Sequence, residues 1–375
     1  MMNERLIQWT LLREWDYLQE CLRLPLLHRY GENIATEHGI LDFAVLAKNG
    51  DLVVVELETG ISSHAKFLHV EEQLTRYKRI TFQGKQTQLA LLFAEDDTPE
   101  RLRDKIHFIC EKLSIKECTY KLTEVHDRYQ RLVTQLAKNI GIPLGPTTAM
   151  DVCYLRWMNT LIKPFADQHV NELPISFSFF FEPSGRGLFR RRTTYGVRKR
   201  LCEDFELLLE RGNKLVLTEY GQRFAEAMLP DILVGFSKTH PLSAEQKRIL
   251  LEVLTNGVMR PCKANIYYFL RFIYLTEGAW VPKSTAPEPK PEQQDFSYWE
   301  LATALLGKRY SWRTLTDFLS FTCNQCEELD LVERVKLSGA YDHVVLTLLG
   351  SRIIGLFELD LHLKRERIHI PLQVM

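Results

Sequence analysis

The chain has 375 residues, which suggests two or three domains at about 100–200 residues per domain. Hydrophobic residues make up 45% and charged residues 26%, the usual balance of a soluble globular protein, which excludes an intrinsically disordered or fibrous chain. Lys+Arg and Asp+Glu each number 48, so the net charge is zero and identifies no partner. A nucleic-acid surface would therefore have to come from local clustering of charge.

Cysteine content and hydropathy predict a reducing compartment. The eight cysteines are scattered, and only Cys323 and Cys326 lie close together. The first residues, MMNERLIQWTLLREWDYLQE, carry charges too early for a signal peptide. No uncharged apolar run approaches 18 residues, so we expect no membrane span and no membrane partner. We therefore expect a cytoplasmic protein with reduced thiols.

The first 140 residues alternate between helical and strand-like patterns. Asp97-Thr98-Pro99 supplies an N-cap region and a first-turn proline for one of the helices. Strands interleaved with helices predict a compact α/β domain over 1–140, a mixed sheet flanked by helices. Apolar spacing predicts a helix over 5–23, strands over 40–47, 52–58 and 88–94, and helices over 65–80 and 98–113.

The remaining residues predict a mainly helical region with two similar parts. Each part has two short apolar strands and then a threonine that caps a helix, at 205–228 and again at 331–358. In the second copy, two short helices over 311–320 and 324–331 precede the hairpin. Helices followed by a hairpin have the order of a winged helix.

This region also sets the expected domain boundaries. Further elements are predicted as helices over 147–163, 194–204 and 243–278, and a strand over 174–181. The segment 282–294 has four prolines and no apolar periodicity. We expect a winged-helix-like DNA-binding domain over 145–235, a helical connector over 236–281, a proline-rich linker or loop over 282–296, and a C-terminal winged-helix-like domain over 297–375.

One predicted hairpin and the helix after it carry residues suited to catalysis. Asp42 lies in one strand, Glu56 and Glu58 end the next, and the helix carries Gln73 and Tyr77 at i, i+4. This arrangement resembles the PD-(D/E)xK nuclease superfamily over about a quarter of the chain, and the segment from Gln73 to Tyr77 matches its QxxxY element. The resemblance implies that Asp42 and Glu56 hold Mg²⁺ beside a scissile DNA phosphate.

The register of the hairpin decides whether these acids can meet. A two-residue turn at Asn49-Gly50 would place Asp42 on the opposite face from Glu56. A three-residue loop, with Gly50 left-handed in a bulge, places Asp42 opposite Glu56 and leaves Glu58 on the same face. Only the bulged register builds a metal site, and glycine at position 50 permits it.

The sequence departs from the superfamily pattern at Glu58, where a lysine is usual. A minority of restriction enzymes resemble this E-x-E pattern, in which a carboxylate can orient or deprotonate the attacking water. The charge role of the lysine would then fall to a second metal or to another cation such as Lys66. The alternatives are an inactive nuclease fold, or carboxylates that merely end a surface hairpin. The last is disfavoured because both strands are apolar on both faces.

Other polar residues of this region have two interpretations each. Gln73 and Tyr77 either have a functional role, in which they hydrogen-bond near the site or touch the DNA backbone, or are ordinary helix-surface residues. Glu14 and Glu20 in the first helix either supply an extra acid, as first helices do in some relatives, or are solvated charges.

A second signal is a basic stretch over 185–200, GRGLFRRRTTYGVRKR, which contains seven Lys and Arg and no acid. Such density suits DNA phosphates and guanine edges, and the alternative is a solvated charged face. By contrast, Cys323 and Cys326 form a single CxxC in a predicted helix, better explained as half-buried structural cysteines than as a zinc site. The candidate DNA-binding residues are Arg186, Arg190, Arg191, Arg192, Thr194, Arg198, Lys199 and Arg200, with Arg192 and Arg198 as expected base readers and Lys199 as an expected phosphate contact.

These patterns together predict a Mg²⁺-dependent, sequence-specific DNA endonuclease similar to a type II restriction enzyme. Its substrate would be double-stranded DNA, cut with the help of a homodimer or a partner subunit. One alternative is a winged-helix DNA-binding regulator whose nuclease-like domain is inactive. Another is a nuclease of repair or transposition.

Overall fold

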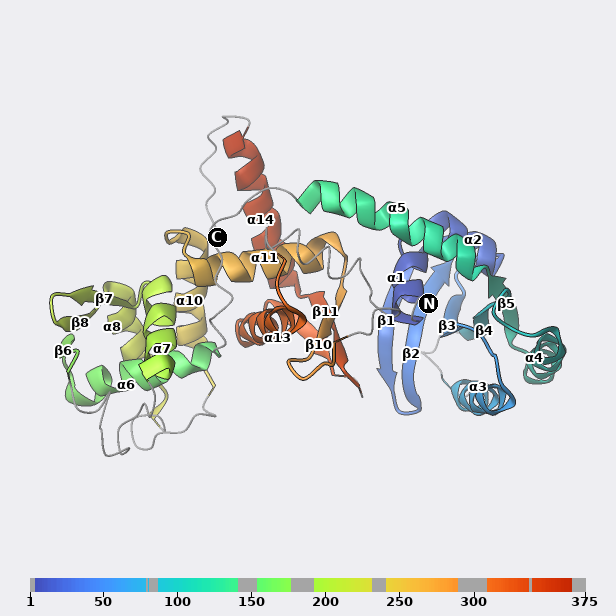
Figure 1. Cartoon of the computed structure of the whole chain (residues 1–375), viewed down its shortest axis with the longest axis horizontal. Coiled ribbons are helices and arrows are strands. Elements are labelled where there is room, and N and C mark those ends of the chain that lie inside the picture. Colours follow the sequence, from blue (N-terminus) through green and yellow to red (C-terminus); the bar gives the residue numbers. More distant parts are fainter. Residues whose placement is uncertain are drawn as a thin grey trace. The chain divides into compact units, whose positions relative to one another are not determined.

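The computed structural model describes residues 4–78, 80, 87–140, 154–176, 192–230, 241–288, 309–336 and 339–365. They belong to two compact units, Met1–Asn139 with Pro289–Leu301, and Ile140–Glu288 with Ala302–Met375. Both units are drawn in Figure 1. Among the helices of these described ranges, none is long and apolar enough to cross a membrane.

The first unit contains a five-stranded mixed sheet. Its strands are β1 (Leu26–Thr36), β2 (Gly39–Ala47), β3 (Leu52–Glu58), β4 (Thr87–Ala94) and β5 (Lys116–Tyr120), in that order across the sheet. The β1–β2 and β2–β3 pairs are antiparallel, whereas β3–β4 and β4–β5 are parallel. The predicted mixed sheet and its strands β2, β3 and β4 are confirmed. The sequence pattern missed β1, because two register shifts interrupt the period of two by which a strand is recognised.

Helices cover both faces of this sheet (Figure 1). They are α1 (Glu4–Leu11), α2 (Trp15–Leu22), α3 (His64–Tyr77), α4 (Glu100–Leu113) and α5 (Leu122–Ile140). On one face, α1 and α2 pack against Val53 and Val55, and on the other, α3 and α4 pack against Leu52 and Val54. Every residue of β3 is buried, as expected of a strand that is covered on both faces.

The predicted single helix over 5–23 is wrong, because the chain breaks between α1 and α2. The backbone amides of Arg13 and Glu14 both donate hydrogen bonds to the carbonyl of Thr10, and the first helix ends there. The break lets Leu11 from α1 and Leu18 from α2 enter the same apolar cluster beneath the sheet. Tertiary packing therefore overrides a continuous amphipathic pattern.

The second unit contains two runs of similar elements. The first comprises a short 3₁₀ helix η1 (Leu155–Trp157), α6 (Met158–Gln168), β6 (Glu172–Pro174), α7 (Arg192–Asp204), β7 (Leu208–Arg211), β8 (Lys214–Leu217) and α8 (Glu219–Glu226). After α10 (Ala244–Asn256), the second comprises α11 (Pro261–Leu275), β9 (Ala279–Pro282), α13 (Trp312–Glu328), β10 (Val332–Val335), β11 (Tyr341–Leu346) and α14 (Leu348–Arg365). In both, the last strand of the hairpin lies centrally and pairs with the earlier single strand, giving the orders β6-β8-β7 and β10-β11-β9.

The two runs share the same cap between hairpin and helix. The hydroxyl oxygen of Thr218 accepts a hydrogen bond from Gly221 N at 3.0 Å, and Thr347 does the same for Gly350 N at 3.0 Å. Both threonine caps were predicted and are confirmed.

The residues ahead of each cap match as well. Glu206 and Asp330 both have positive φ, 56° and 58°. The next residues, Leu207 and Leu331, accept a backbone bond from the capping threonine at 3.1 Å in each case. This repetition of local geometry indicates an internal structural repeat.

Three expectations for this unit need correction or lie outside the described residues. The two short helices expected over 311–331 form one helix, α13. Parts of the expected connector and linker belong to the second repeat itself, because β9 pairs with β11 and α11 packs on α14 through Tyr267 and Phe357. Residues 147–153 of one expected helix and 177–181 of an expected strand lie outside the described residues.

The capping geometry predicts that alanine substitutions at two glycines of α14 change the stability in opposite directions. A Cβ on Gly350 would lie 2.0 Å from the carbonyl oxygen of Leu331, whereas a Cβ on Gly355 meets nothing within 4 Å. We expect Gly350→Ala to lower the free energy of unfolding by about 3 kcal/mol, and Gly355→Ala to raise it by about 0.5–1 kcal/mol. Urea unfolding of both variants measures this. Equal stability of the two would contradict the repeat geometry.

Candidate functional site

The hairpin of β2 and β3 adopts the bulged register. Ala47 N donates to Asp51 O at 2.9 Å and Gly50, at φ 92°, closes the loop. Phe43 lies opposite Val55, so the next position in this register puts Asp42 opposite Glu56. The expected bulge is confirmed.

Asp42 is tied to the neighbouring strand by its own carboxylate. Its Oδ2 accepts a hydrogen bond from the backbone of Leu57 at 2.7 Å. From α1, the Gln8 side chain donates to the main-chain oxygen of Asp42 at 2.8 Å. The Asp42 carboxylate is thus fixed at the end of β3, with its second oxygen not used in this bond.

Glu56 is buried and only half satisfied. Glu56 is 4% exposed, and its Oε1 accepts a hydrogen bond from Gln73 Nε2 at 2.8 Å. Among the described residues, Glu56 Oε2 has no hydrogen-bond partner although it is buried. A buried carboxylate oxygen of this kind is costly unless a cation or donor completes it. Gln73 is therefore brought to the site, as expected from the sequence.

Glu58 is also buried, at 5% exposure, and it pairs with a helix residue. Its Oε2 lies 2.9 Å from Lys66 Nζ, and the same ammonium donates to Thr59 Oγ1 at 3.2 Å. Behind it, Tyr120 OH donates to the main-chain oxygen of Glu58 at 2.9 Å. The Glu58 side chain is thus held by α3 and its backbone by β5.

Tyr77 has a different position from Gln73. Its hydroxyl donates to Ile40 O at 3.2 Å, so α3 is fastened to the start of β2. Burial, followed by the nearby Glu56 charge, raises the pKa of Tyr77. The tyrosine therefore supports the hairpin and is not seen to bind the carboxylates.

Glu4, at the start of α1, is an acid that no sequence pattern singled out. Glu14 instead forms an ion pair with Arg128 at 2.7 Å, and Glu20 is exposed. Glu4 acts electrostatically on Asp42, which places it near the carboxylates. These positions favour the interpretation of Glu14 and Glu20 as charges outside the carboxylate site. No sequence signal distinguished Glu4, because its approach depends on how α1 packs.

Burial and mutual repulsion raise the pKa values of these carboxyl groups. Burial, then Glu4 and Glu58, hold the pKa of Asp42 well above its usual range. Burial, then Asp42 and Glu58, do the same for Glu56. Burial and Glu58 raise the pKa of Glu4 to about 7, while Lys66 lowers it. Clustered acids of this kind are typical of sites that bind cations or transfer protons.

The donor set fits a cation that needs few protein ligands. Within the described ranges, no three His, Cys, Asp or Glu side chains form a group that could hold a metal ion. Mg²⁺ commonly binds through one or two carboxylates, with water and substrate phosphate completing its shell. The partnerless Glu56 Oε2 and the facing Asp42 suit that mode, whereas a site formed by protein ligands alone does not fit.

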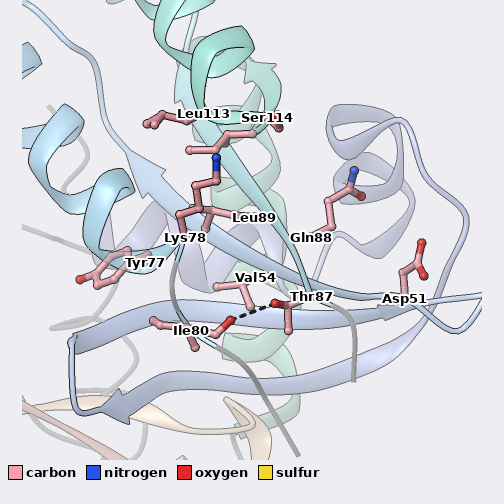
Figure 2. A pocket seen from close by; sticks show the side chains of 11 residues that line it. Asp51, Val54, Tyr77, Lys78, Ile80, Thr87, Gln88, Leu89, Leu113 and Ser114 are labelled. Carbon is pink, nitrogen blue, oxygen red and sulfur yellow. Dashed lines mark hydrogen bonds between the residues drawn. The ribbon is translucent and has the colours of Figure 1, made fainter. Parts of the chain in front are cut away.

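A cavity of ≈ 400 Å³ lies at the other end of α3 (Figure 2). Tyr77, Lys78 and Thr87 line it, and Thr87 Oγ1 donates to Ile80 O at 3.0 Å. Asp51 at the start of β3 also lines it, whereas the carboxylates lie at the end of that strand. The cavity is therefore separate from the acidic cluster.

The expected DNA-binding cluster is only partly described. Arg186, Arg190 and Arg191 lie outside the described residues, as do the side chains of Arg192 and Thr194. The helix expected near 194–204 is confirmed as α7.

Arg198 has a structural role, which contradicts its expected reading of DNA bases. It is 4% exposed, and Nη1 donates to Thr160 Oγ1 at 2.7 Å. Its guanidinium lies 5.0 Å from the ring centroid of Trp157. The side chain therefore joins α7 to α6, because position 198 falls on the inner face of the helix.

Lys199 and Arg200 lie further out. Lys199 forms ion pairs with Glu203 at 3.2 Å and with Glu210. Burial lowers the pKa of Lys199, but its bonds to Glu210 and Glu203 outweigh this and raise it. Arg200 is exposed. The outward face of α7 is thus mixed in charge, not uniformly basic.

We expect Arg198→Ala to lower the free energy of unfolding by about 2–4 kcal/mol, because it removes a buried charged hydrogen bond and a cation–π contact. Urea unfolding checks this. Arg200→Ala, on the exposed face, should change stability by less than about 0.5 kcal/mol. Wild-type stability of Arg198→Ala combined with weaker DNA binding would restore the original assignment.

The paired cysteines of α13 are structural. Cys323 and Cys326 are both 0% exposed, and burial raises the pKa of Cys323 to about 12. Cys326 O accepts from Leu331 N at 2.9 Å, as Cys202 O accepts from Leu207 N at 2.8 Å in the first repeat. The structural interpretation is confirmed, although both side chains are fully buried.

The similarity of this chain to known proteins is slight. No protein-family model and no curated protein matches it. A solved structure described as a repair endonuclease from Pyrococcus abyssi is 16% identical, with a TM-score of 0.22. The similarity covers 29% of this chain and 45% of that chain, so less than half of that protein is represented. A likeness this slight carries no argument about function.

Proposed function

We propose that this protein is a Mg²⁺-dependent DNA endonuclease whose first unit is a PD-(D/E)xK-like nuclease core. The observation that carries the proposal is the register of the β2–β3 hairpin, which places Asp42 opposite Glu56, with Glu58 two residues further along the strand. Glu56 Oε2 is buried there without a partner among the described residues. Keeping such acids ionised in an apolar sheet is costly, so a bound cation is the expected compensation.

In this proposal, Asp42 and Glu56 would hold Mg²⁺, and Gln73 would keep Glu56 in place through its bond to Oε1. When bound, Mg²⁺ would neutralise charge on the scissile phosphate and acidify water. Glu58 would accept the proton of the water that attacks phosphorus in line. The bond from phosphorus to the 3′ oxygen then breaks, and solvent protonates the leaving oxygen. The products are a 5′-phosphate and a 3′-hydroxyl.

The second unit would supply DNA recognition through two winged-helix-like modules. Support comes from the repeated order of helix, strand, helix, hairpin and capped helix. A large recognition unit beside a small nuclease core favours sequence-specific cleavage of double-stranded DNA, as in type II restriction enzymes. Cutting both strands would require a homodimer or a partner subunit. The proposed DNA contacts are Arg186, Arg190, Arg191, Arg192, Thr194, Lys199 and Arg200.

The test is digestion of supercoiled plasmid and phage DNA by the purified full chain in Mg²⁺, in Ca²⁺ and in EDTA. We expect cleavage in Mg²⁺ alone, and discrete fragments whose mapped ends share a sequence. Binding without cleavage in any divalent metal would favour the inactive, DNA-binding regulator. Cleavage without sequence preference would favour a nuclease of repair or transposition.

DNA binding has its own signature. Phosphate contacts should make log K fall with log salt at about −0.9 per phosphate neutralised. Arg200→Ala, which removes an exposed cation from α7, should lower that slope by about 1 and weaken all sequences alike. Binding at several salt concentrations in Ca²⁺ measures this. An unchanged slope would remove Arg200 from the proposed surface.

A further inference from the structure

Lys66 occupies an unusual place for a cation. It lies in the first turn of α3, where the helix dipole disfavours positive charge, and that turn has no acidic residue. The backbone of Lys66 is fixed there, because its N–H donates to the Ser63 side chain at 3.2 Å. The helix dipole therefore does not explain a lysine at this position.

The side chain of Lys66 is held at its far end as well. Its Nζ lies 2.9 Å from Glu58 Oε2 and 3.2 Å from Thr59 Oγ1, both at the end of β3. Glu58 is 5% exposed and Lys66 is itself partly buried, so this is not a surface ion pair screened by water. The Lys66 side chain thus connects α3 to the end of β3, the strand that carries Glu56 and Glu58.

Different cations act on different members of the acidic cluster, Lys66 on Glu4 and Arg76 on Glu56. Among the cations that act on Glu4, Lys66 has the largest influence and Arg5 a smaller one. The carboxylates of Glu4, Asp42, Glu56 and Glu58 repel one another when they are ionised, and this repulsion must be offset. Lys66 contributes to this offset by a direct ion pair with Glu58, at 2.9 Å.

We infer that Lys66 is the positioning residue of the carboxylate site, fixing the Glu58 carboxylate for the attacking water from a helix instead of from the strand. The inference rests on the proposed function. The resemblance leads one to expect a lysine at position 58, two residues after Glu56. Here a carboxylate occupies that strand position, and a lysine approaches it from α3.

The positions of the carboxylate and the lysine can be exchanged by mutation, which gives the test. Glu58→Lys alone leaves two ammonium groups face to face, and Lys66→Glu alone leaves two carboxylates. The double variant Glu58→Lys/Lys66→Glu restores an opposite pair with the lysine on the strand. We expect it to regain at least about tenfold in kcat over either single variant, since contacting residues couple strongly.

Neutral and conservative variants separate positioning from binding. Lys66→Met should lower kcat about 100-fold with little change in KM for DNA, whereas Lys66→Arg should recover part of the loss. Lys78→Met, at the opposite end of α3, is the matched control and should cleave like the wild type. Near-wild-type kcat for Lys66→Met, or a double variant no better than the poorer single one, would overturn the inference.

A second readout does not depend on cleavage. In EDTA near neutral pH, Lys66→Met should melt at a lower temperature than Lys78→Met, and Glu58→Lys/Lys66→Glu should melt above both of its single variants. Failure of wild type and Lys78→Met to cleave any DNA would overturn the proposed function. If the wild type and Lys78→Met cleave DNA and Lys66→Met is also fully active, only the role of Lys66 is overturned.

Discussion

Asp42→Asn and Glu56→Gln are each expected to reduce Mg²⁺-dependent DNA cleavage by at least about 10³-fold, because several kcal/mol of transition-state stabilisation depend on the cation they would hold. DNA binding in Ca²⁺ should remain close to that of the wild type, since the recognition surface is expected on the second unit. Plasmid cleavage under single-turnover conditions, together with binding measured on the same DNA, distinguishes the two effects.

Glu72→Gln is the control for these variants. Glu72 is an exposed acid on α3, one residue before Gln73, and its removal changes charge without touching the site. It should cleave like the wild type. Full cleavage by Asp42→Asn would exclude the β2–β3 hairpin as the active site, whatever the behaviour of the other variants.

The second large effect is on stability and its dependence on pH. The pKa of Glu4 rises from 4.5 to about 7 on folding, chiefly through burial and the charge of Glu58. Between those values the folded protein binds more protons than the unfolded chain, so stability falls as pH rises. Glu4→Gln should remove this loss and raise the free energy of unfolding at about pH 8 by on the order of 2 kcal/mol.

Thermal unfolding in EDTA at several pH values measures this effect. At about pH 8 the melting temperature of Glu4→Gln should exceed that of the wild type by about 4–8 °C, whereas near pH 4.5 the two should agree. Adding Mg²⁺ should stabilise the wild type more at the higher pH, because the cation offsets the same repulsion. Glu72→Gln should follow the wild type throughout. Equal pH profiles for wild type and Glu4→Gln would show that Glu4 lies apart from the carboxylates.

The hairpin at the centre of both predictions could be derived from the sequence. Strand patterns located β2 and β3, and Gly50 allowed the left-handed bulge that aligns Asp42 with Glu56. These are local properties, because a loop of three residues fixes the register of the strands it joins. The same holds for the threonine caps, where Thr218 and Thr347 act on an amide three residues away.

Contacts between distant segments could not be derived in this way. Glu4 acts on Asp42 because α1 packs against the sheet through buried residues such as Ile7 and Leu11. Glu14 and Glu20 are the same type of residue as Glu4 and lie near it in the sequence, yet Glu14 pairs with Arg128 and Glu20 faces solvent. Nothing in the pattern of a single helix specifies which acid will face another element.

The basic stretch over 185–200 also shows that contacts between separate elements cannot be derived from the sequence pattern. Clustered Arg and Lys residues predicted a DNA surface, but helical geometry turns Arg198 inward onto Trp157 while Lys199 and Arg200 lie further out. A charge count along the sequence does not contain this information. The packing of α7 against α6 supplies it.

For this protein, the sequence by itself determined the strands β2 to β4, the bulged hairpin and the repeated capped helices, since apolar periodicity and turn residues act over a few positions. Only the tertiary structure decided that Glu4 joins the acids, that Lys66 spans to Glu58 and that Arg198 is buried. Each of these depends on how separate elements pack, and burial and charge pairing between them are set by the whole folded unit, not by neighbours in the chain.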